Sequence, residues 1–241
     1  MASATSGAAA RIEQSPTGGR WNYLTAGGLA ALTEAALYVL GIGYFLVVLD
    51  FASATTPLQQ LELFVANEAT LSAMYLLVYV VFGVVLVPLV LTLHHDLSAG
   101  ARMAMQVTTA FGLIWAGLVV ASGMIATLAT GVVVDLYGTD PAQATTVWLA
   151  ISPVVDGLGG GNEIVGGIWT LLVSVVALRM GALHRVVNYV GLVVGTAGIL
   201  SAVPALGEVG GAIFGLTQIV WFVGIGVLLL RASRRETASV S

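Results

Sequence analysis

The chain has 241 residues, of which 58% are hydrophobic and only 8% are charged. Soluble domains carry about 25% charged residues, so a chain this poor in charge cannot cover a water-facing surface and falls in the membrane class. A net charge of −4 without any lysine excludes a basic face for nucleic acid, and the absence of cysteine excludes disulfides, thiol nucleophiles and thiolate metal sites.

The two ends of the chain differ from the rest in composition. Residues 1–20 are small and polar, include Pro and Gly, and lack the apolar core of a signal peptide. We predict that they form a disordered cytoplasmic tail, and that residues 233–241 form a second one. The membrane domain then covers residues 21–232.

Six stretches between the tails are long and apolar enough to cross a bilayer, which takes about 20 residues for about 30 Å of hydrocarbon. We therefore predict an all-α polytopic membrane protein, a bundle of six transmembrane helices. Pro88 should kink the second span because it lacks an N–H, and the short turn Gly181–Arg185 should make spans four and five a tight hairpin. The predicted spans are Leu24–Leu49, Thr70–Leu93, Met103–Val132, Gly161–Met180, Val186–Val203 and Gly210–Leu230.

Two connections between spans predict short helices of their own. The first covers residues 57–66 and the second 141–151. Each begins with a capping residue followed by proline at the first helical position. Apolar residues recur at helical spacing, so we expect both helices to lie at the outer membrane interface.

The arginines predict the orientation of the bundle. All eight fall on one side of a six-span arrangement, whereas the three opposite loops contain acids and no basic residue. Basic residues of membrane proteins stay on the cytoplasmic side, so both termini should be cytoplasmic. Arginine in place of lysine, with much Ala, Val and Gly, favours a bacterial source, and the predicted location is the bacterial cytoplasmic (inner) membrane.

Glu34 lies about ten residues into the first span, roughly 15 Å from its start. A charge at such depth is expensive and usually faces the bundle interior. We expect Tyr79 or Gln218 as its hydrogen-bond partner, because both lie at comparable depth. Two interpretations remain open: a group that responds to protons, cations or a ligand, or a protonated carboxyl that only bonds neighbouring helices. The small residues on its face are Gly27, Ala30, Ala31 and Gly41.

Asn162 and Glu163 open the fourth span as Asn67 and Glu68 open the second, and LLVxVV follows each pair at the same distance. One interpretation is a parallel repeat of helical hairpins. The other is that an acid at a helix N-terminus suits the helix dipole. No spacing of histidines or acids predicts a catalytic residue, a metal site or a cofactor. The candidate ligand or ion residues are Glu34, Tyr79, Gln218, Glu163 and Asn162.

Glycines at small-xxx-small spacing mark two later helices. Gly191 and Gly195 lie in the fifth span, and Gly207, Gly211 and Gly215 open the sixth. The pattern favours close packing within the bundle, with homo-oligomerisation through one of these helices as the alternative. The expected partner is thus the lipid bilayer, with a second copy of the chain as the alternative through the glycine-rich helices.

The stretch NEIVGGIWTLLVSVVALRMGALHRVVNYVGLVVGTAGIL joins Gly167-x-Trp169 to the turn Arg179–Arg185 and then to a glycine-bearing helix. It resembles the bacterial six-span membrane proteins grouped as domain of unknown function 4386. The hydropathy plan is similar over nearly the whole chain. The resemblance implies the fold and the membrane location and implies no activity.

Three classes of function remain open. A non-catalytic membrane partner or sensor requires the least from this sequence. A small transporter or permeability protein would use a midplane polar cluster around Glu34, and a membrane enzyme for lipid or isoprenoid substrates would need paired acids such as DxxxD, a spacing that does not occur. A water-connected cavity that reaches Glu34 would favour transport, and a packed interior would favour the partner or sensor.

Overall fold

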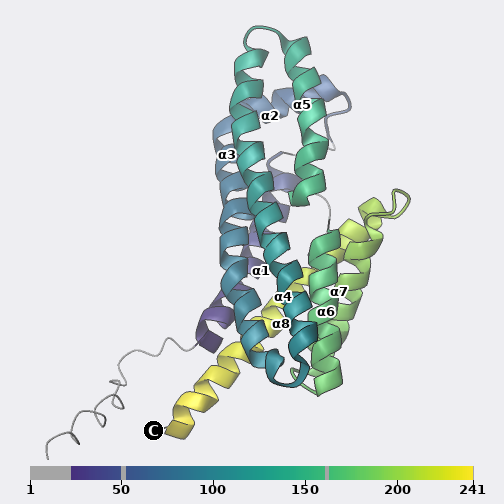
Figure 1. Ribbon diagram of the computed structural model, residues 1–241. Helices are drawn as coiled ribbons and strands as arrows, with labels where there is room; N and C mark the ends of the chain where they lie inside the picture. The colour runs from purple at the N-terminus through teal and green to yellow at the C-terminus, as the bar shows by residue number, and fades with distance from the viewer. Residues whose placement is uncertain (1–22, 50–52, 161–162, 241) are drawn as a thin grey trace, which may run out of the picture.

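The computed structural model describes residues 23–49, 53–160 and 163–240, and every regular element within them is a helix (Figure 1). This agrees with the predicted all-α class. The α-helices, with two π-helical segments labelled η, are α1 (Tyr23–Val47), α2 (Pro57–Ala66), α3 (Glu68–Tyr75), η2 (Leu76–Val81), α4 (Phe82–Tyr137), α5 (Pro141–Val155), η3 (Asp156–Gly160), α6 (Ile164–Met180), α7 (Arg185–Leu200) and α8 (Gly207–Val240).

The longest element is a hairpin made by α3, η2 and α4. Its backbone leaves helical geometry at Ala101, with φ −150° and ψ 47°, and α4 doubles back there at the bottom of Figure 1. Ala101 lies in the polar segment that was predicted to separate the second and third spans. The sequence predicts a kink at Pro88, which lies inside α4. The one residue within α4 whose backbone angles are non-helical is Ala101, not Pro88.

Helices α6 and α7 form the predicted tight hairpin. Gly181 ends α6 in the left-handed conformation, with φ +65°, which favours glycine. Further along, a Cβ added at Gly195 would lie 2.8 Å from the carbonyl oxygen of Gly167, and one at Gly198 would lie 2.9 Å from the Cα of Gly167. The two backbones therefore touch, which explains why glycine recurs in α7.

The surface of the bundle is largely apolar. Leu46 and Leu128, for example, are 70% and 74% exposed, and surfaces of this kind face lipid or partners rather than water. Four helical stretches are long and apolar enough to cross a membrane, with α7 as a shorter apolar helix, so the fold is compatible with a helical membrane protein. The four are Tyr23–Val47, Glu68–Tyr137, Pro141–Met180 and Gly207–Ala238.

Both proline-initiated connections are helical, as predicted. Thr56 accepts a hydrogen bond from the N–H of Gln59 ahead of α2, and Asp140 accepts one from Gln143 ahead of α5. Helix α2 lies crosswise near the top of Figure 1, whereas α5 runs alongside α4. They share a small core with the ends of their neighbours, made of Leu49, Leu61, Phe64, Leu71, Val133 and Ala144. Their place at a membrane interface stays a prediction.

Helix α8 continues to Val240, whereas the sequence predicts a disordered tail from residue 233. The segment contains no Gly or Pro to stop the helix. Ser233 is buried, its hydroxyl lies 2.7 Å from that of Thr25, and the hydroxyl of Thr237 donates to the carbonyl of Ser233. Contact with α1 therefore extends the helix. The predicted tail over residues 1–20 lies outside the described residues.

Candidate functional site

The described arginines lie together at one end of the bundle. They follow the break at Ala101, flank the α6–α7 turn and occupy the last turns of α8, and Figure 1 shows these three places at the lower end. We call this the arginine end; its described members are Arg102, Arg179, Arg185, Arg231, Arg234 and Arg235. Five described acids lie on the opposite side: Glu62, Glu68, Asp135, Asp140 and Glu208. Two others, Asp96 and Glu236, lie at the arginine end.

A cavity of about 170 Å³ lies between the half of α1 farther from the arginine end, η2, α4, η3 and the start of α6. We call it the aromatic cavity, because five of its lining residues are aromatic: Tyr38, Phe45, Tyr79, Phe82 and Trp115. The other lining residues are Leu37, Gly41, Ile42, Val78, Val119, Gly159 and Glu163.

Both π-helical segments border this cavity. Segment η2 supplies Val78 and Tyr79, and η3 supplies Gly159. Gly159 has φ +142°, and a Cβ added to it would lie 3.2 Å from Val119, so the wall of the cavity requires glycine at this point. Single turns of π-helix occur frequently at functional sites, which makes the cavity a candidate site.

The aromatic rings of the cavity hold one another in place. Phe82 lies between Tyr38 and Trp115 in edge-to-face contacts, with ring centroids 5.5 and 5.4 Å apart. Tyr79 stacks on Tyr75 at 5.7 Å. Such contacts stabilise a pair by about 0.5–1.5 kcal/mol beyond the area it buries. The lining is therefore largely pre-formed and does not need a ligand to order it.

Glu163 is the acid of the cavity. It occupies the N-cap position of α6, yet its side chain forms no capping hydrogen bond, and it lines the cavity instead. Among the described lining residues, Glu163 is the one acid, and none is an arginine or a histidine. Its predicted neighbour Asn162 lies outside the described residues.

Glu34 is buried, as predicted, and its exposed fraction is 0%. The prediction of a hydrogen bond to Tyr79 or Gln218 was wrong, because neither carboxyl oxygen has a hydrogen-bond partner among the described residues. Gln218 accepts a bond from Thr170 instead, at 3.3 Å. Similar depth along two helices does not determine which way each side chain points, which is why the pairing failed. Glu34 does not line the aromatic cavity.

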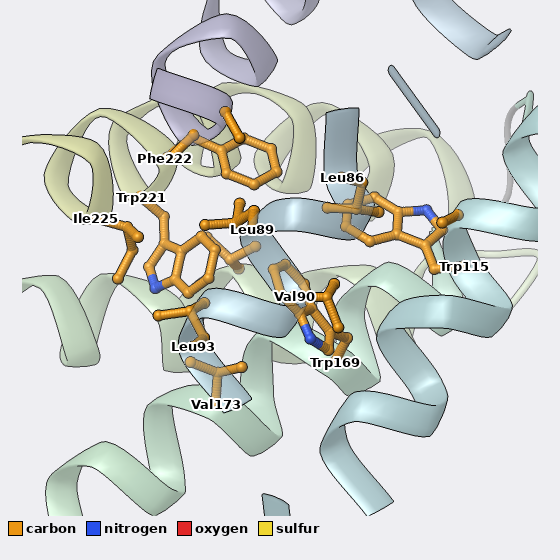
Figure 2. Close-up of a cluster of buried hydrophobic side chains, with 14 of the residues drawn as sticks. Leu86, Leu89, Val90, Leu93, Trp115, Trp169, Val173, Trp221, Phe222 and Ile225 are labelled. Atoms are coloured by element: carbon orange, nitrogen blue, oxygen red, sulfur yellow. The ribbon is translucent and has the colours of Figure 1, made fainter. Parts of the chain in front are cut away.

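A second group of polar side chains is enclosed where α6, α7 and α8 meet. We call Thr170, Ser174, Gln218 and Trp221 the packed interior; all four are fully buried. The hydroxyl of Ser174 and the indole N–H of Trp221 have no hydrogen-bond partner in the described structure. Figure 2 shows Trp169 and Trp221 packed among Leu89, Leu93 and Val173. Aromatic and aliphatic side chains thus surround these polar groups closely.

The two copies of LLVxVV have different structures. The first, Leu76–Val81, is the π-helical segment η2, whereas the second, Leu171–Val176, lies in regular α-helix. The first copy carries Tyr79 of the cavity and the second carries Ser174 of the packed interior. The local structure therefore gives the repeat interpretation no support.

The structure brings two of the predicted residues together, Tyr79 and Glu163, and adds aromatic residues that were not predicted. Tyr38 and Phe45 are seven residues apart on α1, and Tyr75, Tyr79 and Phe82 follow a helical spacing of four and three. An aromatic stripe on each of two successive helices was the available signal. It would have indicated a shared aromatic lining.

Comparison with known proteins gives no match: no family model, no curated protein and no solved structure matches this chain. The resemblance to domain of unknown function 4386 therefore stays a hypothesis, and the functional argument rests on the residues of this chain.

Proposed function

We propose that the chain is a six-span protein of a bacterial cytoplasmic membrane that acts as a non-catalytic sensor by binding a small molecule in the aromatic cavity. The cavity is the observation that carries this proposal. It is bordered by two π-helical segments, its rings are held by mutual contacts, and it presents one carboxylate. These are the features of a pre-formed small-molecule site, mostly apolar with few polar groups.

Six spans follow if the long hairpin is divided at its break. Ala101 separates two helical stretches, and each is longer than the roughly 20 residues needed to cross a bilayer. Helices α1, α6, α7 and α8 supply the other four. Helix α7 has 16 residues, hence a rise of about 24 Å, and its close contact with α6 suits a short span. The grouping of the arginines at one end supports cytoplasmic termini.

The cavity favours a sensor over an enzyme for lipid or isoprenoid substrates. Chemistry on such substrates usually needs paired acids or a metal, and the lining provides one acid among aromatic and aliphatic residues. A single carboxylate can bind and orient a ligand. We therefore propose recognition without catalysis.

Transport is the second candidate, and one observation favours it. Glu34 is buried without a hydrogen-bond partner and lies one helical turn from Tyr38, which lines the cavity. A ligand or proton that moved inward along α1 would meet Glu34 next. The described structure keeps this residue outside the cavity, so transport would require a second conformation.

We also propose, independently of the cavity, that the chain forms homo-oligomers through α8. The small residues Gly207, Gly211 and Gly215 lie along one side of α8, and a Cβ added at Gly211 would meet no atom within 4 Å. This glycine is therefore not used for packing within the chain, unlike Gly195 of α7.

The sequence contains no cysteine, so single-cysteine variants can test the proposal on an otherwise unreactive chain. We propose Ile42→Cys in the cavity wall, with Thr139→Cys beyond α4 and Ala99→Cys near the Ala101 break as controls. All three would be treated in intact cells with a membrane-impermeant thiol reagent. We expect Thr139→Cys and Ile42→Cys to react from outside, and Ala99→Cys to react only after the membrane is permeabilised.

The pattern of labelling separates the parts of the proposal. Reaction of Ala99→Cys and Thr139→Cys from the same side would refute the six-span topology. A reactive Thr139→Cys with an inert Ile42→Cys would refute an accessible cavity and with it the sensor. Labelling of Glu34→Cys from both sides of the membrane would favour transport in place of sensing.

A further inference from the structure

We propose that the ligand of the aromatic cavity is a small organic cation, such as a quaternary ammonium compound. This inference rests on the proposed function and names the class of ligand. It is carried by the combination of aromatic walls, one carboxylate and a small volume in the same space.

The aromatic walls provide the first part of the argument. Five of the lining side chains are Tyr, Phe or Trp, and they come from three elements, so a ligand would contact rings on more than one side. The face of an aromatic ring attracts a cation, with Trp the strongest. Cages of several rings are the usual recognition site for quaternary ammonium groups.

The charge of the cavity provides the second part. Glu163 faces the space without forming its helix cap, and the described arginines lie at the far end of the bundle. A carboxylate in apolar surroundings is stable only when it is paired or neutralised. A bound cation would stabilise the ionised form of Glu163, a pairing for which the described lining offers no basic residue, whereas an anionic ligand would not.

The size of the cavity limits the ligand. At about 170 Å³ it is close to the roughly 150 Å³ cavity that accommodates benzene, and below the roughly 300–1,000 Å³ of sites for drug-sized ligands. A nucleotide or a whole lipid does not fit entirely within this space. A free cation with a few carbons fits, and so does the choline headgroup of a lipid whose tails remain in the bilayer.

The experiment uses choline and its uncharged isostere 3,3-dimethylbutan-1-ol as probes. The full chain would be reconstituted in phosphatidylglycerol nanodiscs, and binding would be measured by calorimetry at high salt to suppress surface attraction. We expect choline to bind at least about tenfold more tightly than the isostere, because only choline carries the positive charge that attracts the ring faces and the carboxylate of Glu163.

Variants connect the binding to the cavity. Glu163→Gln should weaken choline binding by about tenfold or more and leave the affinity for the isostere unchanged, since the shape is kept and the attraction between opposite charges is lost. Tyr79→Leu should also weaken choline binding. Glu68→Gln, an exposed acid at the start of α3, is the matched control and should bind like the unmodified chain. Thermal unfolding of each variant checks that it is folded.

The outcomes distinguish this inference from the proposed function. Equal affinity for choline and the isostere, or full binding by a folded Glu163→Gln, would refute a cationic ligand. If Ile42→Cys were reactive in the same case, the proposed sensor function would still be supported. An inert Ile42→Cys would overturn both. Adding phosphatidylcholine to the nanodiscs identifies the source of the ligand: weaker choline binding there indicates a lipid headgroup, and unchanged binding indicates a free cation.

Discussion

The aromatic cavity and the packed interior contain similar side chains and differ in how they are enclosed. Each combines tryptophan with polar groups in the middle of a helical bundle. In the packed interior, glycines bring α6 and α7 so close that a Cβ at Gly195 would lie 2.8 Å from the backbone of α6. In the aromatic cavity, η2 and η3 interrupt the regular helices and leave space. The placement of glycines and the regularity of the helices thus separate the two regions, although both contain tryptophan and polar side chains.

The largest effect should come from glycine substitutions that compare the two regions. Gly195→Ala places a Cβ against backbone atoms that cannot move aside, so we expect a loss of about 3 kcal/mol in the free energy of unfolding. Gly41→Ala, in the cavity wall, meets only the side chain of Val78, at 3.1 Å. It should change stability by less than about 1 kcal/mol. Unfolding in mixed detergent micelles measures both.

Gly117 provides the background for that comparison, since a Cβ added there meets nothing within 4 Å. Gly117→Ala should be neutral or stabilise α4 by about 0.5 kcal/mol. Equal losses for Gly195→Ala and Gly41→Ala would mean that the two regions are equally tight, and the comparison would fail.

A smaller effect, an increase in the free energy of unfolding, is expected when Glu34 is replaced. Its two carboxyl oxygens are buried without partners, and such groups cost about 1–3 kcal/mol. Glu34→Met keeps the length of the side chain and removes the unpaired oxygens, so the free energy of unfolding should rise by about 1–2 kcal/mol.

Thr170→Val is the control for the Glu34 variant, because it removes a hydroxyl that does have a partner, Gln218. Its free energy of unfolding should fall by about 0.6 kcal/mol, the average for such contacts between membrane helices. Destabilisation by Glu34→Met would show that the carboxyl has a stabilising contact and that its surroundings differ from those described.

Much of the architecture was predictable because helices in apolar surroundings follow local rules. The proline-initiated helices, the Gly181 turn and the burial of Glu34 depend on capping, backbone freedom and hydropathy. The site was less predictable, because it depends on π-helical geometry and on rotation about helix axes. The same LLVxVV letters are π-helical at Leu76–Val81 and α-helical at Leu171–Val176.

The measurement that tests the account most directly compares the reactivity of one cysteine in each region. Ile42→Cys reports on the cavity, and Ser174→Cys, a nearly isosteric change, reports on the packed interior. Both would be treated with the same thiol reagent in nanodiscs, with and without choline. The account predicts that Ile42→Cys reacts at least about a hundredfold faster and is slowed by choline, whereas Ser174→Cys is inert in both conditions. Equal rates for the two cysteines would contradict it.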